Sequence, residues 1–417
     1  MKEMENLRRK IEDLGQLYIP GYVIERVEVY IRDLEAGYSE AHINDAWREL
    51  KRNYREISGG NTTVELYGNE RRTIAYLRYY FFLNYPAMRW ILLKNLENGT
   101  EIIPRKNLIK ILDFGAGPGT ASMAVCDFLE EAEESQIYGN TRVKLYFDEK
   151  YGFFSKCYRK MLSEHGMVES IEYVFDKGQN WYKENFYDLI LLSYVLSELD
   201  NTIREWLLGN VQNCLRNGGY LAIIEPAYKG MRRYVGDFLK NEGIRRSFKV
   251  VDASGSLCSE QNCDQWGECY GKSIKRKELR TAEGMTEEMK RFFEETKGGR
   301  TKWVYAVLKK VEGHEGFVDP SELTEYRESR GKIIKLRGWV IKKISTEGAE
   351  NITLCNGLGR CNLAFWRNRE DISQRVRDIS EGDILCVKGE SLEKSFSKLK
   401  LPSISVTEIV EHIKRAD

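Results

Sequence analysis

Short apolar strands alternate with helical stretches between residues 108 and 226, and this alternation limits the folds open to the chain. A chain that repeats strand, helix and strand must cross over the sheet each time, which predicts a parallel, doubly wound α/β sheet of the Rossmann-like kind. The expected strands are LIKILDF, VKLYFDE, IEYVFD, YDLILLSYV and YLAIIEP, with WVYAVLKK (303–310) as the last strand.

A glycine-rich turn, GAGPG at 115–119, separates the first strand from the predicted helix TASMAVCDFLEEAEE. Glycines let a backbone approach a ligand closely, and the N–H groups of the following helix point at it. The spacing is G-x-G-x-G, whereas dinucleotide-binding turns have G-x-G-x-x-G. The turn predicts a nucleotide-type cofactor site, and its expected binding residues are Asp113, Gly115, Ala116, Gly117 and Gly119.

An acidic pair, Asp148-Glu149, closes the second strand. A carboxylate in this place would accept hydrogen bonds from both hydroxyls of a ribose. We expect Asp148 to fill this role, with Glu149 pointing to the opposite side of the strand as the second choice. A nicotinamide-binding Rossmann domain is the main alternative, although its acidic residue would lie closer to the turn.

The run LRNGGYL, residues 215–221, resembles the L-x-x-G-G-x-L turn of class I methyltransferases. Together with the glycine turn, this resemblance implies a class I S-adenosylmethionine-dependent domain. Methyl transfer needs mainly an aligned acceptor, so the end of the fourth strand supplies the catalytic candidates Ser193, Tyr194 and Glu198, and Ser193 is also a candidate for cofactor binding. Packing or helix capping would explain these three residues equally well.

The chain is long enough for two or three domains. We expect a helical cap over 1–100, with Pro86 kinking or dividing its last, aromatic-rich helix. The methyltransferase-like domain would cover 101–311 and carry an insertion at about 250–300. An all-β segment over 325–417, with one helical interlude, predicts a five-stranded OB-type barrel whose Trp339 and Trp366 could stack bases or fill the core.

Three of the nine cysteines lie close together, at Cys258, Cys263 and Cys269, in a polar segment followed by basic residues. Thiolates at this C-x4-C-x5-C spacing can hold an iron–sulfur cluster or zinc. The spacing differs from the C-x2-C of structural zinc sites, which favours iron–sulfur. The fourth ligand would be His314 or a C-terminal cysteine, and three free thiols remain the alternative.

The net charge of +1 indicates no overall attraction to nucleic acid, but basic residues outnumber acidic ones at 228–249 and at 271–280. Local basic surface matters more than the total for phosphate contacts. No apolar run reaches the ~20 residues that a bilayer span needs. The N-terminus lacks the apolar core of a secretory signal, so we expect a cytoplasmic protein with no membrane partner.

Several motifs together resemble one family, the methyltransferase-like assembly factors of the small ribosomal subunit found in mitochondria and prokaryotes. The segments that carry the resemblance are AYL…YPAM at 75–88, the turn at 113–121, SYVLSEL at 193–199, IEP at 224–226 followed by Arg232 and Arg233, and the cysteine-bearing insertion before a strand with Tyr305.

The resemblance implies rRNA binding during assembly of a 30S-type particle, and a [4Fe–4S] cluster held by Cys258, Cys263, Cys269 and a later cysteine. Cys355 fits that later cysteine best, with Cys361 as the alternative. The family's C-P-H start is absent, because Ser259 and Glu260 follow Cys258.

The sequence is therefore compatible with three functions. The first is an S-adenosylmethionine-binding, rRNA-binding assembly factor, with or without methyl transfer. The second is a tRNA or rRNA methyltransferase unrelated to assembly. The third is a small-molecule methyltransferase in which the metal is only structural, and the basic runs and the barrel disfavour it.

Overall fold

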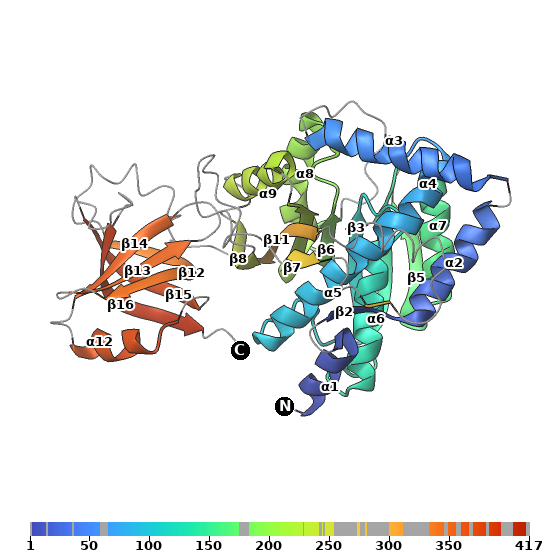
Figure 1. Cartoon of the computed structure of the whole chain (residues 1–417). Helices are drawn as coiled ribbons and strands as arrows, with labels where there is room; N and C mark the ends of the chain where they lie inside the picture. Colours follow the sequence, from blue (N-terminus) through green and yellow to red (C-terminus); the bar gives the residue numbers. More distant parts are fainter. Residues whose placement is uncertain are drawn as a thin grey trace. The chain divides into compact units, whose positions relative to one another are not determined.

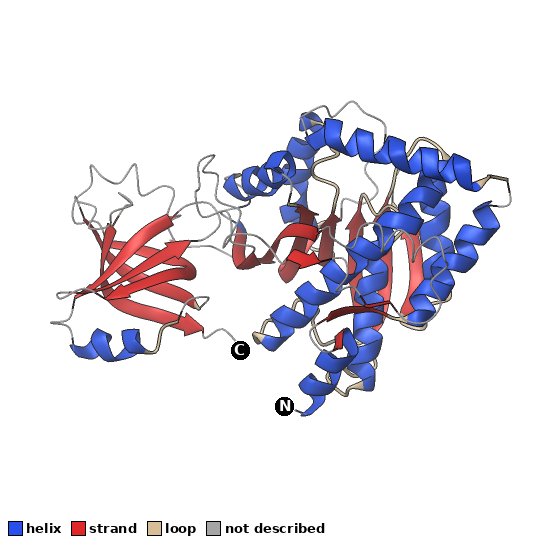
Figure 2. Ribbon diagram, viewed as in Figure 1, coloured by secondary structure: helices blue, strands red, loops and turns tan. Residues whose placement is uncertain are grey.

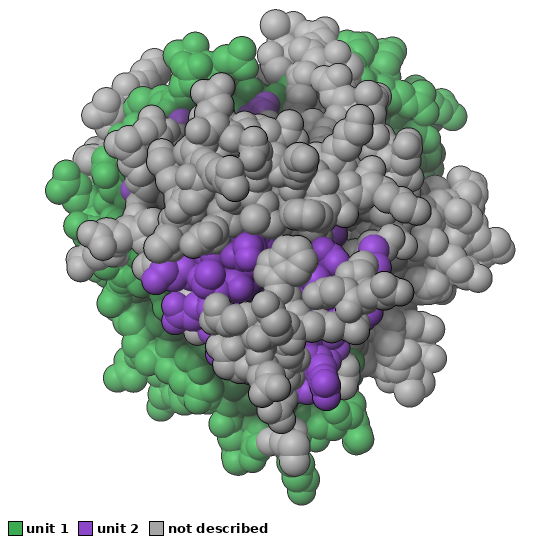
Figure 3. Space-filling model, turned by 90° about the vertical axis from the view of Figure 1, so that its left-hand side faces the viewer, with its two compact units in different colours: residues 1–235, 271–311 green, residues 236–270, 312–417 purple. Residues whose placement is uncertain are grey.

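The computed structural model forms two compact units, residues 1–235 with 271–311 and residues 236–270 with 312–417 (Figure 3). The residues that the structure describes are 2–13, 16–35, 37–58, 66–174, 183–227, 229–241, 244, 247–253, 273–275, 280–281, 300–311, 333–345, 349–355, 360–366, 370–380, 383–392 and 403–413.

A parallel-dominated sheet forms the centre of the first unit (Figure 1). Six of its eight strands, in spatial order, are β5 (Val168–Tyr173), β4 (Arg142–Asp148), β3 (Leu108–Phe114), β6 (Tyr187–Ser193), β7 (Leu215–Pro226) and β11 (Arg300–Lys310). The strands from β5 to β7 pair in parallel, which confirms the predicted α/β class.

The last strand of this series, β11, runs antiparallel to β7, so the sheet is not parallel throughout. The long connection between these strands lets the chain re-enter the sheet from either end. Helices flank the strands (Figure 2), and β6 is buried along nearly its whole length. A continuous apolar run such as YDLILLS is typical of a parallel strand covered on both faces.

The helices of the first unit lie before and between these strands. They are α1 (Lys2–Ile11), α2 (Gly21–Glu35), α3 (Glu40–Ser58), α4 (Glu70–Tyr76), α5 (Phe82–Glu97), α6 (Thr120–Glu134), α7 (Gly152–Leu162) and α8 (Asn201–Cys214). The N-terminal region is not wholly helical as we expected, because two short strands follow α1. They are β1 (Glu12–Asp13) and β2 (Gln16–Ile19), and β2 pairs in parallel with β10 (Arg280–Thr281).

The aromatic-rich helix is interrupted, but the interruption lies before Pro86 rather than at it. A π-helical turn, η1 (Leu77–Phe81), joins α4 to α5, and Pro86 lies inside α5. A proline in a helix removes one hydrogen bond and crowds the carbonyl four residues earlier. That carbonyl belongs to Phe82, directly after the wider π-helical turn.

Three further elements occur between β7 and β11: α9 (Lys229–Lys240), β8 (Phe248–Ala253) and β9 (Ser273–Lys275). None of the helices in the part of the chain that the structure describes is long and apolar enough to cross a membrane.

Five strands of the second unit close into a barrel in the order β12-β13-β14-β16-β15. Their bounds are β12 (Ile333–Ser345), β13 (Ala349–Cys355), β14 (Arg360–Trp366), β15 (Ile384–Leu392) and β16 (Ser403–Ile413), with α12 (Glu370–Arg377) between β14 and β15. Buried aliphatic residues fill the barrel, among them Ile352, Leu354 and Leu385. Along the strands of such a barrel, inward-facing residues alternate with outward-facing ones.

Candidate functional site

A cavity of about 580 Å³ opens where β3, β4 and β6 end. The chain runs outward from β3 to β4 and β5 and then returns to β6 on the other side of β3. Loops at such a reversal diverge, so α/β proteins bind ligands outside the carboxyl ends of these strands. The cavity therefore lies where the fold itself favours a ligand.

One side of the cavity, here called the glycine wall, consists of Gly115, Ala116, Gly117, Asp148 and Glu149. Gly115 has a φ of +64°, and a Cβ at this position would lie 2.2 Å from Cγ2 of Val195. Gly117 has a φ of +56°, but a Cβ there would meet nothing within 4 Å. The first glycine is needed for close packing, whereas the second leaves open space beside the backbone.

The two acidic residues have different surroundings. Glu149 accepts hydrogen bonds from the N–H of Gly117 (2.8 Å) and of Tyr151 (2.7 Å). The Asp148 carboxylate receives no hydrogen bond from the part of the chain that the structure describes, although it is only 9% exposed. Glu149 therefore fixes the glycine turn and faces the same cavity, which corrects the expectation that it points away. Strand β4 ends at Asp148, so the alternation of side chains ends there too.

Burial raises the pKa of Asp148 to about 7 and the pKa of Glu149 to about 7. In Glu149 the hydrogen bonds from Tyr151 and Gly117 oppose this rise. A carboxylate in a partly dry site that lacks protein donors is suited to accept hydroxyl groups of a ligand. Asp148 meets this description.

Asp113 lies behind the turn and does not line the cavity. Its side chain is 1% exposed and accepts a hydrogen bond from the Ser122 hydroxyl at 2.6 Å. Burial raises the pKa of Asp113 to about 7. Gly119, at the start of α6, is also absent from the described lining, and a Cβ there would lie 2.9 Å from the Tyr158 ring. Both residues shape the turn from behind.

The three catalytic candidates, Ser193, Tyr194 and Glu198, all line the cavity at the end of β6. Tyr194 has a φ of +59°, which costs a non-glycine residue about 1–2 kcal/mol. The buried side chain of Glu225, at the end of β7, fixes the segment that follows Tyr194. It accepts hydrogen bonds from the N–H of Leu196 (2.7 Å) and the hydroxyl of Ser197 (2.8 Å).

Aromatic residues far apart in the sequence also line the cavity. This aromatic wall consists of Tyr67, Tyr76, Phe154 and Trp206, with Glu198 among them. The Tyr67 hydroxyl donates to Glu198 Oε1 at 3.2 Å, and the Tyr67 ring lies 4.7 Å from that of Phe154. Sequence reasoning did not assign these aromatic residues to the site. The aromatic content of residues 76–90 was a signal for Tyr76 alone, because the other three lie outside that stretch.

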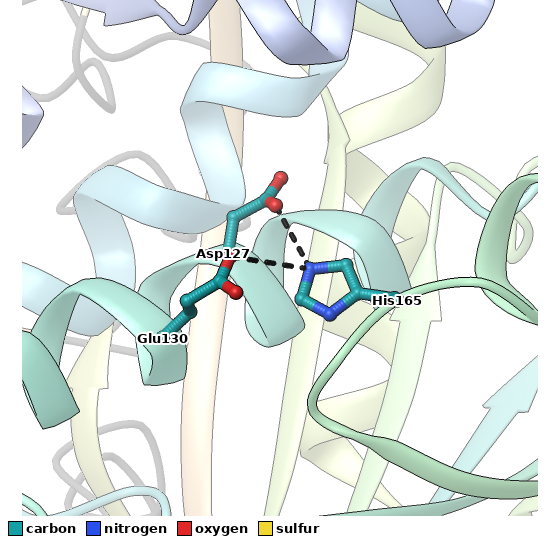
Figure 4. A group of neighbouring side chains, drawn as sticks. All are labelled: Asp127, Glu130 and His165. Carbon is teal, nitrogen blue, oxygen red and sulfur yellow. Dashed lines mark hydrogen bonds and ion pairs between the residues drawn. The ribbon is translucent and has the colours of Figure 1, made fainter.

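Asp127, Glu130 and His165 form a second acidic group, between α6 and β5 (Figure 4). Asp127 accepts hydrogen bonds from Tyr22, Tyr85 and His165 Nε2 (3.0 Å). His165 Nδ1 accepts the N–H of Met167, so the ring proton is on Nε2. A metal-binding histidine instead donates through its second nitrogen. We therefore interpret this group as a structural hydrogen-bond cluster.

The predicted metal ligands Cys258, Cys263 and Cys269, and the alternative His314, lie outside the described residues. The backbone of Cys355 ends β13, opposite Arg360, and Cys361 lies in β14. Of the other cysteines, Cys126, Cys157 and Cys214 are buried, as expected for small apolar side chains.

The parallel-dominated central sheet defines an α/β protein that is consistent with a Rossmann-like fold. Residues 70–266 match the family model described as "Mitochondrial small ribosomal subunit Rsm22". This match confirms the family resemblance that the sequence motifs indicated. It covers α4, the glycine turn, both acidic residues and the end of β6.

Curated relatives match a shorter part of the chain. A hybrid PKS-NRPS synthetase from Acremonium sp. is 31% identical over 125 residues, which is 30% of this chain and 3% of the relative. The tenellin synthetase of Beauveria bassiana is 31% identical over 132 residues, again 3% of its length. The chain thus spans a very small part of these proteins.

Solved structures with similar segments show only weak overall likeness. The S. pombe Stn1–Ten1 complex has 21% identity and a TM-score of 0.17, over 20% of this chain and 58% of that one. An OBody bound to hen egg-white lysozyme has 15% identity and a TM-score of 0.22, over 24% of this chain and 98% of that one. Such scores carry no argument about this fold.

Proposed function

We propose that this chain binds S-adenosylmethionine in the cavity and acts as an assembly factor of the small ribosomal subunit that contacts rRNA. The observation that carries the cofactor proposal is the glycine wall. Gly117 leaves open space beside its backbone, and Asp148 next to it lacks a hydrogen-bond donor among the described residues. A ribose with two neighbouring hydroxyls would supply the missing donors.

The cofactor would supply a methyl group carried on a sulfonium. The residues of this chain would bind and orient it. Gly117 would let the backbone approach the cofactor, and the carboxylate of Asp148 would hold its ribose. Glu149 keeps the turn in position through its hydrogen bond to Gly117. Ser193, Tyr194 and Glu198 face the part of the cavity in which an acceptor would be positioned.

Isothermal titration with S-adenosylhomocysteine tests the cofactor proposal. We expect saturable binding with one site per chain. No binding by the folded protein would contradict it. Binding of a nicotinamide dinucleotide instead would favour the alternative Rossmann function.

The family match supports the association with the small subunit, because the matching model is named for that subunit. Co-sedimentation with small-subunit particles tests this part. Binding to assembly intermediates is the expected result. Methylation of free tRNA or rRNA without particle binding would favour an RNA methyltransferase unrelated to assembly. If the protein binds no RNA at all, a small-molecule methyltransferase is favoured.

An OB-type assignment of the barrel forms a second part of the proposal. The strand order β12-β13-β14-β16-β15, and the position of α12 between the third and fourth strands, support it. OB folds bind single-stranded nucleic acid through one face and its loops. We expect the barrel to contribute to RNA binding.

A [4Fe–4S] cluster held by Cys258, Cys263, Cys269 and Cys355 remains a proposal supported by the sequence pattern and the family resemblance. Zinc is the alternative metal. Anaerobic purification with iron, sulfide and zinc analysis, on the native protein and on Cys263→Ser and Cys355→Ser, tests it. About four irons with matching sulfide, lost in both variants, are expected. Zinc or no metal would contradict the cluster.

The cellular location also remains a prediction. From the sequence we expect the cytoplasm, while the name of the matching family model points to mitochondria. Fractionation of the source cells distinguishes the two.

A further inference from the structure

The aromatic wall and the glycine wall line one cavity and meet at Tyr151, whose N–H donates to Glu149 while its ring lies 5.6 Å from that of Tyr67. Glu149 and Asp148 are tied to the glycine turn, through Gly117 N–H to Glu149 and Ala116 N–H to the Asp148 carbonyl (2.9 Å). Glu198 is tied instead to Tyr67. If the first group holds a cofactor, as proposed above, the second is left for the molecule that reacts with it.

We propose that the aromatic wall binds a single nucleobase of RNA, with the Glu198 carboxyl hydrogen-bonded to the N–H-bearing edge of the base. This inference rests on the proposed function. It goes further, because it assigns the acceptor to a base rather than to a ribose, a protein side chain or a small aliphatic molecule.

The aromatic, apolar character of the wall favours a base. The Tyr67 ring packs edge-on against that of Tyr76, with centroids 5.5 Å apart, and lies tilted by 57° against that of Phe154. Enzymes that modify bases turn them out of the strand into a pocket of aromatic residues, where each stacked base contributes about 1–3 kcal/mol. A ribose or an aliphatic chain gains nothing comparable from such a wall.

The mouth of the cavity has apolar residues on the first turns of α8. Ile203 is 42% exposed, one of the few large apolar side chains on the described surface, and Trp206 lies one turn further along the same helix. Residues three apart share a helix face. The two side chains would contact a base as it enters the cavity, and also the adjacent nucleotide that stays outside the cavity.

Glu198 has the chemistry to recognise the edge of a base. Its Oε1 accepts from Tyr67, and the side chain is half-buried while it lines the cavity. Burial, and then the charges of Glu225 and Glu149, raise the pKa of Glu198 well above its usual range, while Tyr67 and Lys150 oppose this. The neutral acid that this favours offers one donor and one acceptor, which matches an N–H beside a ring nitrogen.

Attack by a base carbon through a covalent cysteine adduct does not fit the lining. None of the described residues around the cavity is a cysteine. Transfer to an exocyclic nitrogen needs no such adduct. The nitrogen lone pair forms the new N–CH₃ bond, the electrons of the broken S–CH₃ bond stay on sulfur, and the nitrogen releases one proton to water at the mouth of the cavity.

Ligand-observed NMR with cytidine tests the base site on the full chain saturated with S-adenosylhomocysteine. Cytidine is the probe because an adenine nucleoside would also fit the proposed cofactor side. Ribose is the ligand control. Glu169→Ala, at an exposed position on β5, is the protein control.

We expect saturation transfer to the base protons of cytidine, and none to ribose. Glu198→Ala should weaken cytidine about tenfold, because a buried hydrogen-bond partner is lost. Glu198→Gln, which keeps one donor and one acceptor, should restore most of the binding. Glu169→Ala should leave it unchanged.

The inference is overturned if cytidine does not bind, if ribose binds equally well, or if Glu198→Ala binds cytidine as the native protein does. A different result would contradict the proposed function, namely that the native protein does not bind S-adenosylhomocysteine. Cytidine can then still be titrated without it. A melting temperature of Glu198→Ala close to that of the native protein shows that this variant is folded.

Discussion

The two walls of the cavity reach the same space by different means. The glycine wall comes from short connections that directly follow β3 and β4, and hydrogen bonds from backbone N–H groups to Glu149 hold it together. The aromatic wall joins Tyr67, Phe154 and Trp206, which lie far apart in the sequence, and side-chain packing holds it together. The first wall is a local property of the chain, and the second depends on the whole fold.

The largest expected effect removes the Asp148 carboxylate from the glycine wall. Asp148→Ala should weaken S-adenosylhomocysteine about 100-fold or more, since two hydrogen bonds to a charged group contribute roughly 1.5–3 kcal/mol each. Isothermal titration measures the change, and Glu169→Ala is the matched control. A loss below about fivefold would mean that Asp148 does not hold the ribose.

A pair of glycine substitutions should separate packing from ligand space. Gly115→Ala places a methyl group 2.2 Å from Val195 and should cost about 1–3 kcal/mol of stability, seen as a lower melting temperature. Gly117→Ala meets no neighbour, so it should lower the melting temperature less while still weakening the ligand. Equal melting temperatures for the two variants would contradict this difference.

The affinity of the glycine wall for S-adenosylhomocysteine should depend on pH through the ionisation of Asp148. Its pKa of about 7 means that the ionised form, which accepts the ribose hydroxyls, grows from about a tenth to about nine-tenths between pH 6 and pH 8. The affinity for S-adenosylhomocysteine should therefore rise about tenfold over this range. Titrations of Asp148→Asn should show a flatter profile. An equal slope in this variant would assign the effect to Glu149.

A smaller effect should appear in the stability of the protein through Asp113. Its pKa is raised to about 7, so the folded protein keeps a proton that the unfolded chain loses above pH 4, and stability falls as the pH rises towards 7. Asp113→Asn should gain melting temperature relative to the native protein between pH 5 and pH 8. Each kcal/mol corresponds to about 2–4 °C. A constant difference across this range would contradict the buried titration.

The smallest effect concerns the independence of the two walls. Tyr67→Phe removes the hydroxyl that contacts Glu198 but keeps the ring, so S-adenosylhomocysteine should bind within about twofold of the native affinity. The same variant should weaken cytidine. A strong loss of cofactor affinity would show that the walls are coupled.

This division also explains what the sequence could predict. The α/β class, the glycine turn and the barrel strands follow from periodicity and from residues close together in the chain. The position of Glu149 was missed because β4 ends one residue earlier, so the alternation of side chains no longer applies. Tyr67 and Trp206 could not be assigned, because only the packed fold brings them to Glu198. The direction of β11 depends on a long connection that no local pattern describes.

The π-helical turn η1 sets the rotational phase between α4 and α5. Before it, Tyr76 lines the cavity; after it, Tyr85 donates to Asp127 on α6 at 2.6 Å. A π-helical turn holds about one residue more than an α-helical turn, and each residue rotates a helix by about 100°. Deleting one residue from 77–81 would make the helix regular and turn Tyr76 away from the cavity while Tyr85 kept its contact. Insertions and deletions here would change ligand binding without touching a ligand-binding residue.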